Sequence, residues 1–245
     1  MRPNELPEFH QLAEYYDALN DHKDYRAETR RLEAIARKLG PTGRTSWLDV
    51  ACGTGRHLAF LKRRHAVEGV DASPEMLRIA RRRVPGVRLR RGDMRTFDLH
   101  RRFDVVSCLF SAIGHLRTKA DVRTAYANFA RHLRDGGVLI VEPWIQPSAF
   151  RTGMLHLRTH ERPDLAIVRL AFSARRGNRS MIHYHFLIGE PGRGVRHFAH
   201  VSEGLLLSPE EHFELMRSAG LSRVSLDPGF LRDRGLLVAV RTAGT

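Results

Sequence analysis

Short apolar runs alternate with amphipathic stretches between residues 46 and 142 of the chain. The apolar runs, which are typical of buried strands, are Ser46–Cys52, Ala66–Asp71, Val87–Arg91, Phe103–Phe110 and Val138–Glu142. The stretches with helical periodicity between them are Arg56–Arg64, Pro74–Arg83 and Lys119–Leu133, the last closed by Asp135-Gly136-Gly137. This alternation predicts a parallel sheet with helices on both faces.

Helical composition dominates the beginning of the chain. Residues 10–39 are rich in Glu, Ala, Leu and Arg, and Gly40-Pro41 is a helix stop. We expect residues 1–40 to form a helical lid and residues 41–145 to form the core that binds the main ligand.

The pattern changes after Trp144. Residues 165–207 lack helical periodicity, and turn residues separate three runs that predict antiparallel strands. These runs are Ala166–Ser173, Ser180–Ile188 and Val195–Leu207. We predict that residues 146–207 form a small antiparallel β platform inserted into the domain.

Residues 208–245 return to the alternating pattern. The capping box Ser208–Glu211 begins a helix that runs to Ala219, and Arg223–Asp227 and Arg234–Arg241 are the final strands. The chain is therefore expected to form a single α/β domain over residues 1–245, with a doubly wound core.

Length, composition and charge narrow the class of protein. A chain of 245 residues with 42% hydrophobic residues suits one α/β domain with a modest insertion. No apolar run reaches the ~18 residues of a membrane-spanning helix, no secretory signal is visible, and the two cysteines are too few for a disulfide framework. We expect a cytoplasmic protein without a membrane partner. The net charge of +14 favours a phosphate-bearing ligand, or it reflects a generally arginine-rich sequence, since the arginines are scattered.

A strand that runs into Gly53-Thr54-Gly55 and then a helix is typical of a nucleotide-binding turn. Glycine allows the sharp turn and a close ligand, which lies beyond the carboxyl ends of the strands. A dinucleotide site would need a glycine where Leu58 stands, and a P-loop would need a Gly-Lys pair, which the chain lacks.

Acidic residues follow the next two strands. Asp71 can accept hydrogen bonds from ribose hydroxyls, and Asp93 can accept one from an adenine amino group, with Met76 and Met94 as apolar neighbours of the ring. Either aspartate alone is equally well explained as a turn former or helix cap. Together they favour a nucleoside ligand.

The chain resembles class I S-adenosylmethionine-dependent methyltransferases at Leu48–Gly55, Gly69–Ser73 and Gly92–Arg95. It is most similar to the N,N-dimethyltransferases that act on dTDP-linked amino sugars in antibiotic biosynthesis, of the desosamine and mycaminose type. The segments that carry this second resemblance are Tyr15–Asp17, Lys23–Tyr25, Cys108–Leu116, Val141–Trp144, Gly192–Phe198 and Arg234–Val238. The resemblance implies a Rossmann-like seven-stranded sheet, S-adenosylmethionine as cofactor, and N-methylation of a small amine such as a nucleotide-linked sugar.

Taken together with the loop chemistry, the resemblance gives a set of candidate site residues. Those expected to bind the cofactor are Tyr16, Tyr25, Asp49, Ala51, Cys52, Gly53, Gly55, Asp71, Ala72, Met76, Asp93, Met94 and Leu109. Those expected to contact the substrate are Phe110, His115, Glu142, Trp144, His185 and Arg234.

Transfer of a methyl group from a sulfonium to an amine mainly requires proximity and orientation, and the amine must be unprotonated. His115 is the candidate base, because imidazole accepts a proton near neutral pH; a packing role, or an acceptor that arrives neutral, is the alternative. Tyr16 or Tyr25 is expected to orient the amine or the sulfonium, with Tyr16 as the second catalytic candidate.

Several alternatives stay open. His183 and His185 share a strand face, but no carboxylate or cysteine has matching spacing, so we expect no metal site. The platform edges favour a homodimer. The segments around Gln146-Pro147, 151–165 and 227–233 depart from the family, which leaves another small amine, or RNA, as the alternative acceptor, although we expect no nucleic-acid partner. A donor-binding scaffold without turnover is the non-enzyme alternative.

Overall fold

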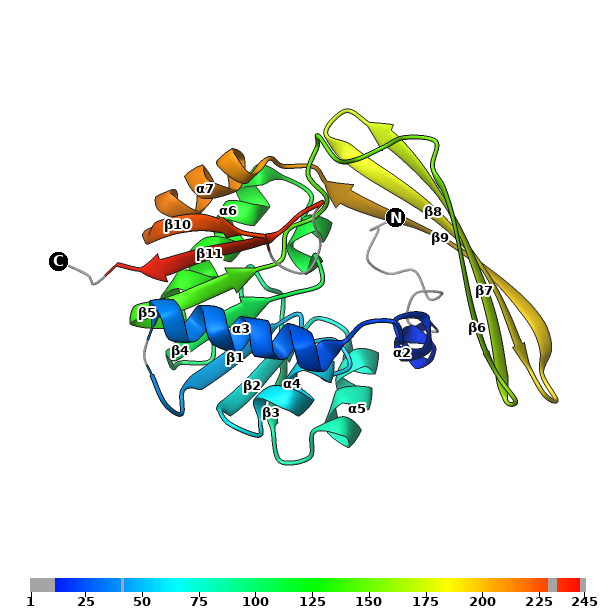
Figure 1. Ribbon diagram of the computed structural model, residues 1–245, viewed down its shortest axis with the longest axis horizontal. Helices are drawn as coiled ribbons and strands as arrows, with labels where there is room; N and C mark the ends of the chain where they lie inside the picture. Colours follow the sequence, from blue (N-terminus) through cyan, green and yellow to red (C-terminus); the bar gives the residue numbers. More distant parts are fainter. Residues whose placement is uncertain (1–11, 41, 229–232, 243–245) are drawn as a thin grey trace. The chain divides into compact units, whose positions relative to one another are not determined.

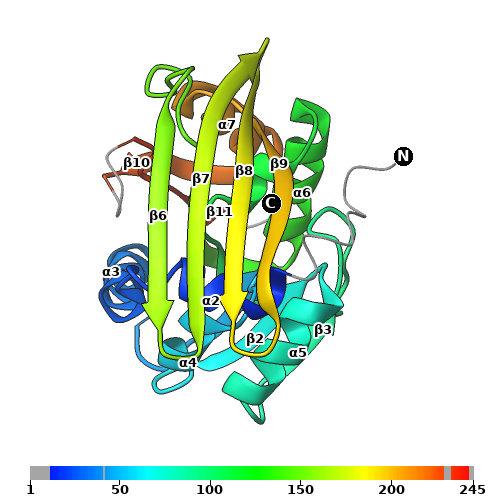
Figure 2. The same ribbon diagram turned by 90° about the vertical axis from the view of Figure 1, so that its right-hand side faces the viewer.

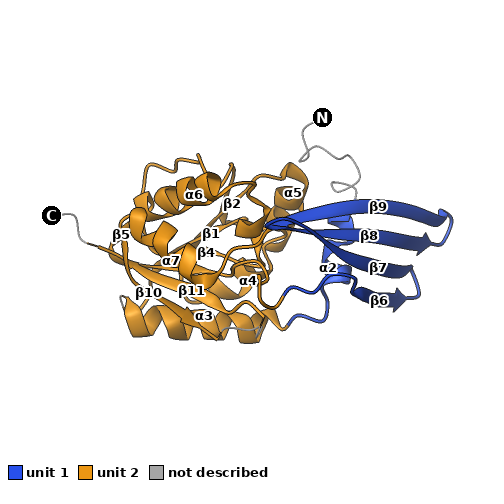
Figure 3. Ribbon diagram, turned by 90° about the horizontal axis from the view of Figure 1, so that it is seen from above, with its two compact units in different colours: residues 1–23, 150–204 blue, residues 24–149, 205–245 orange. Residues whose placement is uncertain are grey.

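The computed structural model describes residues 12–40, 42–228 and 233–242, which fall into two compact units (Figure 3). The core unit contains residues 24–149 and 205–245, and the platform unit contains residues 1–23 and 150–204. The expected helix start at residues 10–11, Pro41 of the expected helix stop, and residues 229–232 of the divergent loop lie outside the described residues. None of the helices within the described ranges is long and apolar enough to cross a membrane.

A seven-stranded sheet forms the centre of the core unit, in the order β10-β11-β5-β4-β1-β2-β3 (Figure 1). Its strands are β1 (Ser46–Val50), β2 (Ala66–Asp71), β3 (Arg88–Arg91), β4 (Phe103–Cys108), β5 (Leu133–Val141), β10 (Leu221–Asp227) and β11 (Leu236–Arg241). Neighbours from β3 to β5 are parallel, whereas β11 is antiparallel to both β5 and β10. The expected doubly wound sheet is confirmed.

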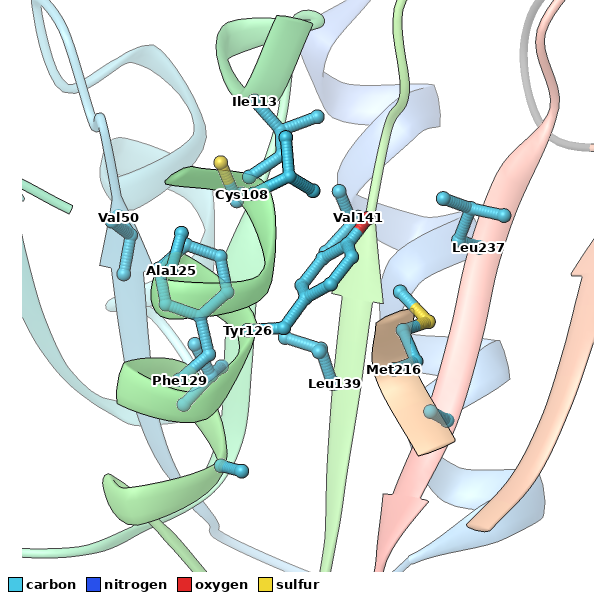
Figure 4. Close-up of a cluster of buried hydrophobic side chains, with 14 of the residues drawn as sticks. Val50, Cys108, Ile113, Ala125, Tyr126, Phe129, Leu139, Val141, Met216 and Leu237 are labelled. Atoms are coloured by element: carbon cyan, nitrogen blue, oxygen red, sulfur yellow. The ribbon is translucent and has the colours of Figure 1, made fainter. Parts of the chain in front are cut away.

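Helices pack on both faces of this sheet. They are α3 (Tyr25–Leu39), α4 (Arg56–Leu61), α5 (Pro74–Arg83), α6 (Lys119–Arg131), α7 (Pro209–Ser218) and the short 3-10 helix η2 (Ala112–His115). Tyr126 and Phe129 of α6 share one buried cluster with Leu139 of β5 and Leu237 of β11, and Figure 4 shows Tyr126 beside Leu139. Tyr126 and Phe129 are three positions apart and lie on one face of α6, and burial of that face stabilises the helix against the sheet. A second buried cluster includes Leu32 of α3 together with residues of the sheet, so α3 also packs on the sheet.

The platform unit is a four-stranded sheet in the order β6-β7-β8-β9 (Figure 2). Its strands are β6 (Leu155–Arg162), β7 (Leu165–Arg176), β8 (Arg179–Glu190) and β9 (Gly194–Leu205), and the short helices η1 (Leu12–Glu14) and α2 (Tyr16–Leu19) accompany them. Leu12 and Tyr15 form one buried cluster with Ile167 and Ile188, which gives the sheet a covered face.

Three expectations about individual elements were wrong, besides several ends that differ by two or three residues. The platform has a fourth strand, β6, whose residues are exposed almost throughout; only Leu155 and Leu157 in it are apolar, too short an alternation to predict a strand. The expected helix over residues 10–39 is broken between α2 and α3, because the Asp24 side chain caps α3 by accepting from Ala27 N–H at 2.9 Å. β5 begins at Leu133 rather than Val138, because the glycines at 136 and 137 form an irregularity within the strand instead of a loop before it.

Candidate functional site

Residues 51–55 form a tight turn between β1 and α4. Ala51, Gly53 and Gly55 have φ angles of +56°, +53° and +76°, a region that glycine adopts at little cost. The turn is fixed because Cys52 N–H donates to the Val70 carbonyl of β2 at 3.1 Å. The carboxyl end of β1 therefore carries a rigid glycine loop, as the sequence predicts.

Asp71 connects the glycine loop to the end of β2. Its Oδ2 accepts from Gly53 N–H at 2.7 Å and its Oδ1 from Ser73 N–H at 2.8 Å. Burial raises the pKa of this carboxyl above its usual range. Carboxylate oxygens can accept more than one hydrogen bond each, so the group can still bind ligand hydroxyls. The structure thus brings Gly53 and Asp71 together.

Asp49 lies on β1, just before the loop. Its side chain is only 2% exposed, and the Ser107 hydroxyl donates to Oδ1 at 2.7 Å. Burial raises the pKa of Asp49 to about 6, opposed by the nearby His57 and by the hydrogen bond from Ser107. An ionised carboxylate in this setting attracts a cationic ligand group strongly, because few solvent dipoles screen it.

Asp93 follows β3, next to the end of β2, since Gly92 N–H donates to the Asp71 carbonyl at 3.0 Å. Arg95 holds the Asp93 carboxylate in a fork, with Nε 3.0 Å from Oδ1 and Nη2 2.6 Å from Oδ2. These bonds lower the pKa of Asp93. Arg95 also donates to Asp121 of α6 at 2.8 Å. Sequence reasoning missed Arg95 in this role, although it stands in the quoted Gly92–Arg95 motif.

The other expected cofactor residues of the core unit have varied surroundings. Cys52, Met76 and Leu109 are buried, Met94 is partly buried against the core, and Ala72 is exposed. Tyr25, at the start of α3, packs its ring 5.0 Å from the His57 ring and beneath the Arg56 guanidinium, 4.6 Å away. Because Arg56 begins α4 directly after the loop, Tyr25 lies near the glycine turn. Burial raises the pKa of the Cys52 thiol, which disfavours the reactive thiolate form.

The loop after β4 has an unusual backbone. Phe110 and Ser111 have φ angles of +55° and +58°, a conformation that is strained for residues other than glycine. Glu142 holds this segment by accepting from Phe110 N–H at 2.9 Å. The Ser111 hydroxyl donates to the Pro143 carbonyl at 2.8 Å. Two consecutive strained residues at a strand end are typical of a functional loop.

Arg234, two residues before β11, completes this network. Its Nη1 donates to the Ser111 hydroxyl at 2.8 Å, and its Nε and Nη2 form a fork on Asp233 at 3.0 and 2.8 Å. The side chain is only 16% exposed. Arg234 was expected to contact the substrate, and the structure shows it bonded to the strained loop. Sequence reasoning missed Ser111 and Asp233 as partners.

His115 lies at the end of η2, on the same loop. Its ring stands edge-on to Trp144, with ring centroids 5.3 Å apart, and the residue is exposed. Gly114 permits this approach, since a Cβ there would lie 2.6 Å from Trp144 Cβ. The structure therefore brings His115, Trp144 and the Phe110–Ser111 segment together. This group can present an imidazole to a substrate amine.

Tyr16 and His185 belong to the platform unit. Tyr16 begins α2, and His185 lies on β8 with its Nδ1 3.1 Å from Nε2 of His197. Among the residues that the structure describes, no group of three or more His, Cys, Asp or Glu side chains is arranged to hold a metal ion.

Comparison with known proteins adds a family model described as a methyltransferase domain, which matches residues 48–137. The chain is 40% identical over 233 residues to the dTDP-3-amino-3,6-dideoxy-alpha-D-glucopyranose N,N-dimethyltransferase of Streptomyces fradiae, covering 94% of this chain and 91% of the relative. The crystal structure of DesVI from Streptomyces venezuelae has a TM-score of 0.87 and 39% identity, covering 94% of this chain and 98% of that one. SAM-bound CalS10, an amino pentose methyltransferase from Micromonospora echinaspora, has a TM-score of 0.84 and 36% identity, covering 99% and 100%.

Proposed function

Since the chain belongs to the family of dTDP-amino-sugar N,N-dimethyltransferases, which are S-adenosylmethionine-dependent enzymes, we propose that it methylates the amino group of a dTDP-linked amino sugar. One observation carries the proposal: the similarity extends over 94% of the chain, well beyond residues 48–137, which the methyltransferase-domain model matches. Transfer to another small amine, or to RNA, is the alternative.

The carboxyl ends of β1 and β2 fit the methyl donor. The Gly53–Gly55 turn leaves room for a close ligand, Asp71 can bind ribose hydroxyls, and buried Asp49 favours a positive charge nearby. Asp93 and Met94 are proposed to bind the adenine. When bound, S-adenosylmethionine supplies an electrophilic methyl group.

His115 is proposed to accept the proton of the substrate amine. The contact with Trp144 holds the imidazole in place, and the strained Phe110–Ser111 segment fixes the loop that carries it. An amine that has lost its proton has the free lone pair that the reaction requires. Tyr16 is proposed to orient that amine.

Purified enzyme, methyl donor and a dTDP-linked amino sugar test the proposal, with the product followed by mass spectrometry. We expect the mass to increase in steps of one methyl group. Transfer to other amines but to no dTDP-amino sugar would refute the substrate and leave the reaction class. His115→Asn should lower kcat about 100-fold, whereas His156→Asn on exposed β6 should not.

We also propose that the protein is a homodimer assembled through the outer face of the platform sheet. Leu155 and Leu157 are 65% and 66% exposed there, and Leu170, Phe172 and Leu187 are exposed beside them. Apolar patches of this kind mark interfaces. In a chain of net charge +14, two copies repel each other least where apolar side chains meet, and the five side chains named here are all apolar, which makes a second copy the fitting occupant. Leu157→Glu should yield monomers in sedimentation experiments. His156→Glu is the control and should leave the dimer intact, because its side chain lies on the opposite face of β6. Dimers of both variants would contradict this interface.

A further inference from the structure

A cavity of about 280 Å³ lies at the amino edge of the core sheet, lined by residues of α3 and by the residues that precede β1 and β2. β1 is five residues long and rises ~3.3 Å per residue, so roughly 17 Å of strand separates this cavity from the glycine loop at the other end. The cavity is therefore distinct from the candidate methyltransferase site.

The floor of the cavity is held by a chain of hydrogen bonds. The Thr45 hydroxyl is 2.9 Å from His65 Nδ1, and His65 Nε2 is 3.2 Å from Glu33 Oε1. Arg64 Nη1 lies 3.6 Å from the other oxygen of Glu33. The carboxylate of Glu33 is only 8% exposed and is already paired, so it contributes little free negative charge to the cavity.

The rim of the cavity carries two further arginines, Arg37 and Arg44. Both are exposed, and neither forms a hydrogen bond or ion pair with any part of the chain that the structure describes. With Arg64, three guanidinium groups line a concave surface that holds one carboxylate. An oxyanion would give Arg37 and Arg44 the hydrogen-bond acceptors that the described part of the protein does not provide, and Arg64, already paired with Glu33, adds positive charge beside them.

We propose that this cavity binds a phosphate group. A tetrahedral phosphate offers several oxygens at once, which suits guanidinium groups that approach from different elements better than a planar carboxylate does. Trp47 is fully buried and Ala36 is 6% exposed, so the apolar lining that these two residues give is shallow and suits at most a small organic group. The ligand is thus free phosphate or a small phosphate ester.

Fluorescence of Trp47 tests the proposal directly. The chain has two tryptophans, so Trp144→Phe leaves Trp47, in the cavity lining, as the only one. We expect a saturable change in its emission when inorganic phosphate or a hexose 6-phosphate is added at constant ionic strength, and no change with chloride. Tighter binding of the hexose phosphate identifies an ester as the ligand, and equal binding identifies free phosphate. The response should persist when S-adenosylhomocysteine is present in excess, because the donor site lies at the other end of β1.

Matched arginine variants localise the effect. Arg37→Ala with Arg44→Ala should weaken phosphate binding at least about tenfold, because charge-assisted hydrogen bonds are lost. The control pair, Arg81→Ala with Arg82→Ala on exposed positions of α5, removes the same charge and should leave binding unchanged. Unchanged thermal unfolding confirms that each variant is folded. Absence of a saturable response up to ~20 mM phosphate, or equal weakening by both pairs, would overturn the proposal.

Discussion

Asp49 is a residue whose proposed function conflicts with stability. Burial raises its pKa from 3.8 to about 6, so at pH 7 the folded protein holds an ionised group that costs about 3 kcal/mol. This cost is fully present above pH 6 and disappears below pH 3.8, the pKa of Asp49 in the unfolded chain. Asp49→Asn should therefore raise the free energy of unfolding by about 1–3 kcal/mol at pH 7 and have no such effect near pH 4. Urea denaturation at both pH values measures this.

The same variant should bind the methyl donor more weakly, because the buried negative charge is lost. Calorimetric titration measures that change. A variant that is less stable than the parent at pH 7 would show that the Asp49 carboxylate contributes more through the Ser107 bond than it costs through burial.

Arg234 provides a second test among single residues. Lysine cannot form the fork on Asp233 and reach the Ser111 hydroxyl together, so Arg234→Lys should loosen the strained loop that carries His115. We expect kcat to fall about 10- to 100-fold while donor affinity is unchanged. Ser111→Ala should reproduce the effect. A rise in the KM for the sugar with kcat unchanged would instead support the original expectation of a substrate contact.

Some contacts within the candidate site could be predicted from the sequence, and others could not. Gly53 and Asp71 follow from the strand pattern, because neighbouring parallel strands bring their carboxyl ends to one edge of the sheet. The bond between Arg234 and Ser111 joins positions 123 residues apart, and no local pattern reveals such a partner.

Whole helices and strands were predicted best where their signals are local. The limits of α5 are those expected, since Ser73 caps the helix and Pro74 begins it. β6 was missed, because it is an edge strand of the platform with almost every residue exposed, and its sequence therefore carries no burial pattern.

The capping box of α7 gives a prediction for this helix. The Ser208 hydroxyl accepts from Glu211 N–H at 3.3 Å, and Glu211 Oε2 accepts from Ser208 N–H at 2.8 Å. Ser208→Ala should lower the free energy of unfolding by about 1 kcal/mol. Ser218→Ala, at the other end of the same helix, is the control and should cost less. Equal losses in urea denaturation would show that the box does not stabilise α7.

The stability of the whole molecule should depend on pH through His212. This buried residue of α7 has its Nδ1 2.7 Å from the Tyr126 hydroxyl of α6, and burial lowers its pKa from 6.5 to about 4. Between these values the unfolded chain binds a proton that the folded protein does not. The contribution of neutral His212 to the free energy of unfolding is therefore fully present above pH 6.5. It falls by about 3 kcal/mol as the pH drops towards 4.

Comparison with a variant isolates the contribution of His212. It is needed because protonation of Asp49 raises the free energy of unfolding over part of the same pH range, whereas protonation of His212 lowers it. His212→Gln should be less stable than the parent at pH 7, and the difference should shrink as the pH falls to 4. Thermal unfolding at several pH values measures it. A constant difference would show that His212 has the same pKa in the folded protein as in the unfolded chain.

The platform unit is assembled from two separate pieces of chain, residues 1–23 and 150–204. Leu12 and Tyr15 from the first piece share a buried cluster with Ile167 and Ile188 from the second. Anyone who exchanges platforms between relatives to alter acceptor preference must therefore transplant both pieces at once. A graft of 150–204 alone would pair a foreign sheet with the host's own amino-terminal helices, and mismatched packing there would be mistaken for a loss of catalysis.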